Sequence, residues 1–124
     1  MRVNKKEINN IMNILDLNLR RANNTLDNIV AIVNKYIPSI ISIDKDKYCI
    51  NVKTDLIYDI HKSYFKDIRD IGIDINKVKS MDIEFLIDYN RFNNKTIVCC
   101  YLNHIVDNEE KKLFLSKKEI LKVA

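Results

Sequence analysis

The stretch Met-Asp-Ile-Glu-Phe-Leu-Ile-Asp-Tyr, residues 81–89, decides the predicted fold class of this 124-residue chain. Apolar residues occupy its odd positions and mostly polar residues its even ones, a period of two that is typical of a strand with one buried face. Residues 90–95 predict a turn, and residues 96–104 predict the return strand. An antiparallel hairpin is therefore expected in the second half of the chain.

The residues before this hairpin predict two helices and a second hairpin. Helical spacing of apolar residues predicts one amphipathic helix over 5–21. A second helix is expected from an N-cap at Asn24 to a point just before Pro38. Two short apolar runs, 39–43 and 48–52, flank a polar turn and predict a β-hairpin.

The remaining segments predict further helix. A third helix is expected to begin near residues 54–55 and to end before Gly72, the only glycine in the chain. Residues 113–115 are expected to add a strand, and a capping box formed by Ser116 and Glu119 predicts a short C-terminal helix. The predicted class is α+β, with two N-terminal helices, an antiparallel sheet of two hairpins around a central helix, and a short C-terminal helix. We expect a single domain over residues 1–124.

Composition predicts a cytoplasmic protein that is at most peripheral to membranes. No run approaches the roughly 20 uncharged apolar residues that a membrane-spanning helix needs. The N-terminus is basic but lacks the apolar core of a signal peptide. Three cysteines are an odd number, which does not suggest a secreted disulfide framework.

Cys99, Cys100 and His104 raise the question of a metal or redox site. Successive side chains of a strand point to opposite faces, so the two cysteines cannot easily share a ligand. Cys100 and His104 share a face but lie four residues apart, about 13 Å along a strand. Zinc ligands lie within about 2.3 Å of the metal. We therefore expect the cysteines to pack in the core.

No other feature of the sequence predicts catalysis or a cofactor. The turn at 44–46, Asp-Lys-Asp, begins like a calcium loop, but the later ligand positions of an EF-hand are not filled. A single glycine excludes a glycine-rich phosphate loop. His61 is interpreted as a surface or boundary residue of the third helix. We predict a protein that is not an enzyme and that holds no metal or cofactor.

The acidic residues of the 81–89 stretch are further candidates for chemistry. Asp82, Glu84 and Asp88 lie on its polar side. Paired carboxylates can carry out acid–base or metal chemistry, but an alternating polar face is expected of any one-sided sheet. We interpret these three carboxylates as a solvated face.

Basic residues near the C-terminus are the remaining functional candidates in a chain of formal net charge +4. The predicted anion-binding residues are Arg91, Lys95, Lys111, Lys112, Lys117 and Lys118. If the last strand packs beside the 90–95 turn, these cations form one patch, and Phe92 is placed to insert into a membrane. Each cation near an anionic membrane contributes about 1 kcal/mol to binding. The alternative is an ordinary solvated face, because Glu109, Glu110 and Glu119 lie among the lysines.

One resemblance bears on the choice of anion. Asn-Thr-Leu-Asp at 24–27, an apolar helix, Pro38 and Ser-Ile-Asp-Lys-Asp at 42–46 resemble a late protein family of vertebrate poxviruses. Further similar positions follow towards the C-terminus: Arg91, Phe92, Lys95, Asp107, Glu109, Lys112, Leu115 and Lys117.

The resemblance implies a viral factor that binds phosphoinositides and takes part in forming the crescent membranes of immature virions. In that family the lipid-binding segment is densely basic. This chain has Asn93, Asn94 and the apolar run 97–100 there, so that only Arg91 and Lys95 match it.

Two other classes of function stay open. A small nucleic-acid-binding protein would use the same cations with Tyr48, Tyr89 or Tyr101 as stacking platforms. The sequence pI of about 8.9 lies below the value above 9 that is usual for such domains. A protein-binding module or homodimer is the third class, and exposed apolar residues on the first helix would favour it.

Overall fold

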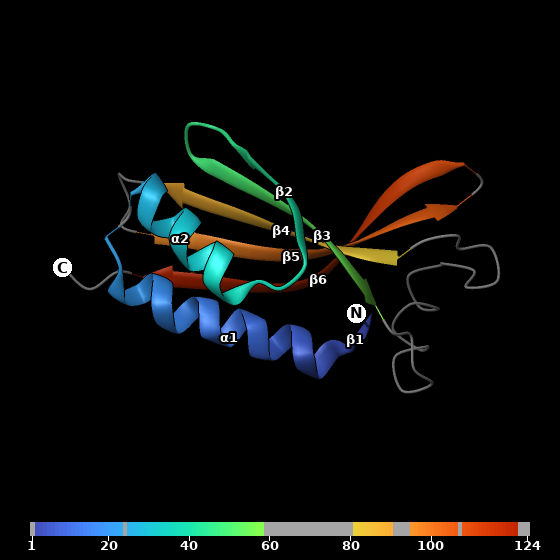
Figure 1. Ribbon diagram of the computed structural model, residues 1–124, viewed down its shortest axis with the longest axis horizontal. Helices are drawn as coiled ribbons and strands as arrows, with labels where there is room; N and C mark the ends of the chain where they lie inside the picture. The colour runs from blue at the N-terminus through green and yellow to red at the C-terminus, as the bar shows by residue number, and fades with distance from the viewer. Residues whose placement is uncertain (1, 24, 59–80, 91–94, 107, 122–124) are drawn as a thin grey trace.

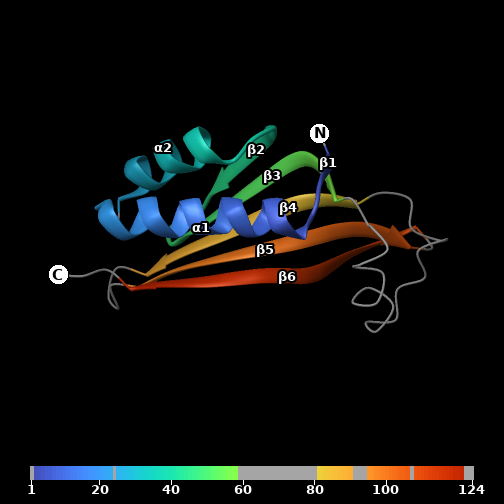
Figure 2. The same ribbon diagram turned by 90° about the horizontal axis from the view of Figure 1, so that it is seen from below.

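The computed structural model describes residues 2–23, 25–58, 81–90, 95–106 and 108–121. In this part of the chain, two helices lie against one face of a curled six-stranded sheet (Figures 1 and 2). The elements in chain order are β1 (Arg2–Val3), α1 (Lys5–Arg21), α2 (Leu26–Tyr36), β2 (Ile40–Lys45), β3 (Cys49–Tyr58), β4 (Met81–Asn90), β5 (Lys95–Val106) and β6 (Glu109–Leu121).

The sheet is mixed, and its strand order places β6 at one edge. The order is β1-β3-β4-β5-β6, and β2 also pairs with β3. The short strand β1 runs parallel to the end of β3, whereas β2 pairs antiparallel with the beginning of β3. The two therefore share one edge of β3, and β6 forms the opposite edge of the sheet.

Helix α1 confirms the predicted helix over residues 5–21. The Asn4 side chain accepts a hydrogen bond from the Glu7 amide at 2.9 Å, and the Glu7 carboxylate accepts one from the Asn4 amide at 3.4 Å. This reciprocal capping satisfies amides that have no partner within the helix. The buried stripe consists of Ile8, Met12, Leu15 and Leu19. With it, α1 packs against β6, α2, β1 and β5.

Helix α2 follows the prediction except at its first residue. Its N-cap is Thr25, whose hydroxyl accepts a hydrogen bond from the Asn28 amide, and the predicted cap Asn24 lies outside the described residues. Ile29 and Val33 are buried. The helix ends before Pro38, which cannot continue it.

The hairpin of β4 and β5 confirms the strands predicted at 81–89 and 96–104. Ile83, Phe85, Ile87 and Tyr89 are buried at 0–1% exposure, as the alternation predicts. The hairpin predicted at 39–43 and 48–52 is also confirmed by the antiparallel pair of β2 and β3. The 91–94 part of the predicted turn lies outside the described residues.

The predicted central helix is wrong at its beginning. Residues 54–58 continue β3, in which buried Thr54, Leu56 and Tyr58 alternate with exposed Asp55 and Ile57. This alternation is that of a strand paired with β4. The helical spacing of the apolar residues therefore does not decide the structure of this segment. The remainder of the predicted helix, including His61 and Gly72, lies outside the described residues. The described sheet thus does not surround a central helix but carries α1 and α2 on one face.

The predicted C-terminal helix is also wrong. Residues 109–121 form the single strand β6, which pairs with β5 along its whole length. Ser116 lies opposite Cys100 in this ladder, and Ile120 is completely buried. The capping box depends on residues three apart, whereas the ladder supplies backbone partners for the whole segment. The strand expected at 113–115 is present, but it is the middle of a much longer one.

Three irregularities interrupt the otherwise regular pairing of the described strands, and the first is a register shift of β2 on β3 between Ile40 and Ser42. The register of β3 on β4 shifts between Lys53 and Ile57, where the Thr54 hydroxyl donates a hydrogen bond to the Ile83 carbonyl at 2.7 Å. The register of β5 on β6 shifts between Cys100 and Tyr101. A bulge of this kind bends a strand and increases its twist. Beyond it, the orange end of the β5–β6 hairpin turns out of the line of the sheet (Figure 1).

Candidate functional site

The face of the sheet opposite to α1 and α2, here called the open face, carries the polar side chains of the central strands. On β4 it presents Asp82, Glu84 and Asp88, which alternate with the buried apolar residues. The predicted position of these carboxylates on the polar side is therefore confirmed. Their predicted solvation is wrong for Glu84, which is only 1% exposed.

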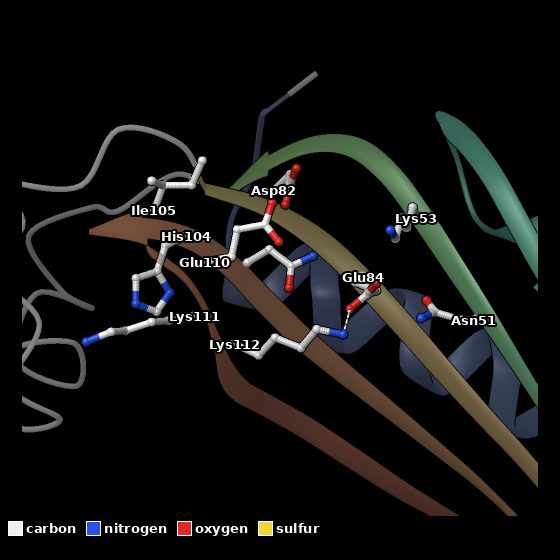
Figure 3. A pocket seen from close by; sticks show the side chains of 10 residues that line it. Asn51, Lys53, Asp82, Glu84, His104, Ile105, Glu110, Lys111 and Lys112 are labelled. Carbon is white, nitrogen blue, oxygen red and sulfur yellow. Dashed lines mark ion pairs between the residues drawn. The ribbon is translucent and has the colours of Figure 1, made fainter. Parts of the chain in front are cut away.

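A hollow of about 420 Å³ lies on the open face near the register shifts of β3 on β4 and of β5 on β6, and we call it the polar basin. Its lining residues are Asn51, Lys53, Asp82, Glu84, Asn103, His104, Ile105, Glu110, Lys111 and Lys112 (Figure 3). They come from β3, β4, β5 and β6. Strands that are far apart in the sequence thus contribute to one site.

An ion pair crosses the floor of the basin from β6 to β4. The Lys112 ammonium lies 2.5 Å from the Glu84 carboxylate, drawn as a dashed line in Figure 3. Lys112 passes over β5, where its ammonium lies 6.0 Å from the centre of the Tyr101 ring. The Glu84 side chain is 2% exposed and that of Lys112 is 56% exposed. A buried carboxylate is therefore neutralised by a cation that water can reach.

The basin also holds buried polar atoms that have no hydrogen-bond partner among the described residues. These atoms are Asn51 Oδ1, Asp82 Oδ1, Glu84 Oε1, Asn103 Oδ1 and both ring nitrogens of His104. Native structures leave few buried polar atoms unpaired. Their concentration in one hollow makes the basin a candidate binding site.

The lysines predicted to bind anions lie on the edge strand. Lys111, Lys112, Lys117 and Lys118 all belong to β6, so the structure brings them onto one element. It does not bring them onto one face of the sheet. Lys112 and Lys117 pair in register with the open-face residues Asn103 and Cys99, whereas Lys111 and Lys118 pair with His104 and Val98, which alternate with them along β5. His104 and Lys111 nevertheless line the basin, next to the open-face residues Asn103 and Lys112.

Lys95 lies at the start of β5 beside the end of β6, and Arg91 lies outside the described residues together with Phe92. Glu119 accepts from two of the predicted cations, with Lys95 Nζ at 3.2 Å and Lys117 Nζ at 3.0 Å. The hydrogen bond from Lys117, followed by that from Lys95, holds the pKa of the Glu119 carboxyl below its usual value. The same contact with Glu119 raises the pKa of Lys117.

Two lysines of β6 take no part in the ion pairs with Glu84 and Glu119 described above. Lys111 and Lys118 have no carboxylate partner among the described residues. Two apolar side chains of the same strand, Phe114 and Leu121, are 52% and 61% exposed. Phe114 meets the Tyr101 ring edge-on at 6.1 Å. We call β6 the basic edge, meaning its exposed apolar residues Phe114 and Leu121 and its four lysines Lys111, Lys112, Lys117 and Lys118.

The cysteines confirm the predicted strand geometry. Cys99 pairs with open-face Lys117 and Cys100 with Ser116, so the two thiols point to opposite faces. Burial, followed by the neighbouring Cys99, raises the pKa of Cys100 to about 12. Cys100 is a core residue as expected, whereas Cys49 and Cys99 are only half-buried. Burial, followed by the charges of Asp88 and Asp46, raises the pKa of Cys49.

The structure corrects one proposed stacking platform. Tyr89 is 1% exposed and its hydroxyl donates to the Asp46 carbonyl at 3.4 Å, so it cannot stack on a base. Tyr48 is 37% exposed with the Lys47 ammonium above its ring, and Tyr101 is half-buried on the open face. The sequence predicts Tyr48, Tyr89 or Tyr101 as stacking platforms for nucleic-acid bases.

Sequence reasoning missed the polar basin. Glu84 was assigned to a solvated face, and its partner Lys112 was assigned to an anion-binding patch. No local pattern indicates that the two meet, because the contact depends on β6 being a strand beside β5.

Neither α1 nor α2, the helices of the described residues, has the length and apolar character needed to cross a membrane. Comparison of the chain with protein-family models, with curated proteins and with solved structures finds no match.

Proposed function

We propose that this chain is a binding protein, not an enzyme, that docks on anionic membranes through the basic edge. The observation that carries the proposal is the gathering of four lysines and two exposed apolar side chains on one strand at the edge of the sheet. Lysine ammoniums attract phosphate head groups, and Phe114 and Leu121 can enter the interface between head groups and acyl chains.

The resemblance to the poxvirus late protein family supports a more specific form of the proposal. Lys95, Lys112 and Lys117 are among the matching positions. By this resemblance the anionic lipid is a phosphoinositide, the setting is the cytoplasm of an infected cell, and the process is assembly of the virion membrane.

Co-sedimentation with phosphatidylcholine vesicles, with and without a phosphoinositide, tests the proposal. The variant K117Q/K118Q removes one cation from each side of the edge and leaves Lys112 with Glu84. At about 1 kcal/mol per cation, its affinity for phosphoinositide vesicles is expected to fall roughly thirtyfold.

The control variant K45Q/K47Q removes the same charge from the β2–β3 hairpin, at the opposite edge of the sheet. We expect it to change the affinity by less than about threefold, because it lowers only the general charge. Equal losses in the two variants, or no binding to phosphoinositide vesicles, would refute docking through the basic edge.

A second function, association with a protein or with a second copy of the chain, is favoured by one specific observation. Ile14 and Leu17 on the outer surface of α1 are 41% and 51% exposed. Measurement of the molar mass in solution by light scattering tests this alternative. A dimer that becomes a monomer in the variant I14S/L17S would support it, and a monomeric wild type would reject the homodimer.

A further inference from the structure

Four of the six unpaired polar atoms named above are oxygens that accept hydrogen bonds, and the other two are the ring nitrogens of His104. Asp82 Oδ1, Glu84 Oε1 and Asn103 Oδ1 are all hydrogen-bond acceptors, and each is buried without a donor from the described residues. An ionised carboxylate accepts hydrogen bonds and cannot donate them. A ligand that pairs with these three oxygens must therefore supply donors.

The three residues that carry these oxygens are close neighbours on the open face. Asp82 and Asn103 lie directly opposite each other in the β4–β5 register, where Cα atoms are about 5 Å apart. Glu84 lies two residues from Asp82 on the same strand, about 7 Å away on the same face. Neighbouring acceptors at this spacing suit a group that carries several donors, such as an ammonium with three N–H groups.

Charge narrows the choice of group. The lining holds three carboxylates, Asp82, Glu84 and Glu110, and three lysines, Lys53, Lys111 and Lys112. Among the described residues only Glu84 and Lys112 form an ion pair there, and the Lys111 ammonium points away from Asp82 and Glu84 (Figure 3). Hydrogen bonds in which both groups are ionised are about twice as strong as neutral ones. Within the described residues, no three side chains of the types His, Cys, Asp and Glu come together as metal ligands do. A cationic donor with N–H groups fits this lining better than a bare metal ion.

We propose that the polar basin binds the ammonium group of a small organic primary amine, which donates hydrogen bonds to Asp82, Glu84 and Asn103. The Glu84–Lys112 ion pair shows that the basin can bind a primary ammonium group, because the Lys112 ammonium already contacts one oxygen of the Glu84 carboxylate. The hollow of about 420 Å³ lies within the range of small-molecule sites and leaves room for the body of the amine. The basin shares Lys111 and Lys112 with the basic edge, but the residues proposed to hold the ammonium lie on β4 and β5.

Three related compounds test the proposal by calorimetry and by NMR titration of the full chain. Cadaverine has primary ammonium groups, 1,5-pentanediol has the same length without charge, and the fully N-methylated bis-quaternary analogue has charge without N–H donors. We expect saturable binding of cadaverine, with shifts of the Asn103 and Glu84 amide resonances, and at least tenfold weaker binding of the other two. Equal binding of the diol would indicate a polyol site, and equal binding of the quaternary compound a purely electrostatic one; either result overturns the proposal.

The variant D82N identifies the site without disturbing the Glu84–Lys112 pair, and D88N is its matched control. Asp88 lies on the same strand and face but outside the basin, and it is exposed. D82N is expected to weaken cadaverine binding at least tenfold and D88N less than twofold. Equal effects of the two, or no saturable binding of cadaverine to the wild type, overturn the proposal. Vesicle binding by D82N should equal that of the wild type, so failure here is separate from failure of the membrane proposal.

Discussion

Lys112 of β6 neutralises Glu84 of β4 across the strand that separates them, with 2.5 Å between ammonium and carboxylate. The carboxylate is buried and the ammonium is partly exposed, so the pair differs from an ordinary surface salt bridge. It ties the edge strand to the middle of the sheet through side chains. The stability of β6 and the shape of the polar basin are thereby linked.

The first prediction concerns this pair. Replacing Lys112 by Met leaves a buried carboxylate without its cation, which we expect to cost about 2 kcal/mol of unfolding free energy. This is less than for a fully buried pair, because water can reach the position that the exposed ammonium leaves. The additional change Glu84→Gln should recover most of the loss, and a double-mutant cycle in urea measures the coupling.

Lys53→Met is the matched control for this cycle. Lys53 lies directly opposite Glu84 in the β3–β4 register but has no ion-pair partner among the described residues. The substitution Lys53→Met should lower the unfolding free energy by less than about 0.5 kcal/mol. If Lys53→Met lowers the unfolding free energy as much as Lys112→Met does, the loss comes from removing any lysine from the open face. It then does not come from breaking the Glu84–Lys112 pair.

The second prediction uses the thiol of Cys100. Because the pKa of this thiol in the folded state is about 12 and its ordinary pKa is 9.0, the folded state favours the protonated thiol. The stability that this provides is complete below pH 9 and is lost as the pH rises towards 12. At pH 10.5 the loss is about 2 kcal/mol. Urea unfolding at pH 7 and pH 10.5 measures it.

Comparison with Cys100→Ala isolates the contribution of this thiol. The variant is less stable at pH 7 because of the smaller side chain, but its stability should fall by about 2 kcal/mol less than that of the wild type between the two pH values. Parallel pH profiles would show that other groups, such as Cys49, whose pKa is also raised, cause the whole decline.

The third prediction separates strand from helix at the C-terminal end. In a helix capped by Ser116, Ser116→Ala would cost about 1 kcal/mol, whereas in β6 the change should cost less than about 0.5 kcal/mol. Ile120→Ala should cost about 3 kcal/mol because Ile120 is completely buried. Its neighbour Leu121 is 61% exposed, and Leu121→Ala serves as the control with a loss below about 0.5 kcal/mol. A large loss for Ser116→Ala would contradict the strand.

The elements that the sequence predicts correctly carry their information locally. In α1, the cap at Asn4 and Glu7 and the apolar stripe lie within one helix. In β4, the alternation from Ile83 to Tyr89 identifies both the strand and its buried face. Each of these patterns is satisfied by its own segment, so no knowledge of distant partners is needed.

The errors occur where a distant partner decides the structure. Ser116 and Glu119 resemble a helix cap, but Ser116 pairs with Cys100 and Glu119 accepts from Lys95. The burial of Glu84 likewise depends on Lys112, which is 28 positions away in the chain. Local propensity is a weak prior that such tertiary contacts override. The candidate site could therefore be predicted only as a set of residues on separate elements.

The last prediction tests the apolar part of the basic edge. Phe114→Ser removes a half-exposed ring from β6, and we expect the affinity for phosphoinositide vesicles to fall roughly tenfold, since burying such a ring in the interface is worth about 1–2 kcal/mol. Ile41→Ser is the control: Ile41 is 66% exposed on β2, at the opposite edge of the sheet, and should leave binding unchanged.

Salt distinguishes the two contributions to membrane docking. Raising the ionic strength screens the lysines, so the difference between the wild type and K117Q/K118Q should shrink. The effect of Phe114→Ser should persist, because the transfer of an apolar ring does not depend on charge. A Phe114→Ser effect that disappears together with the lysine effect would mean that the ring acts by positioning the cations and does not enter the membrane.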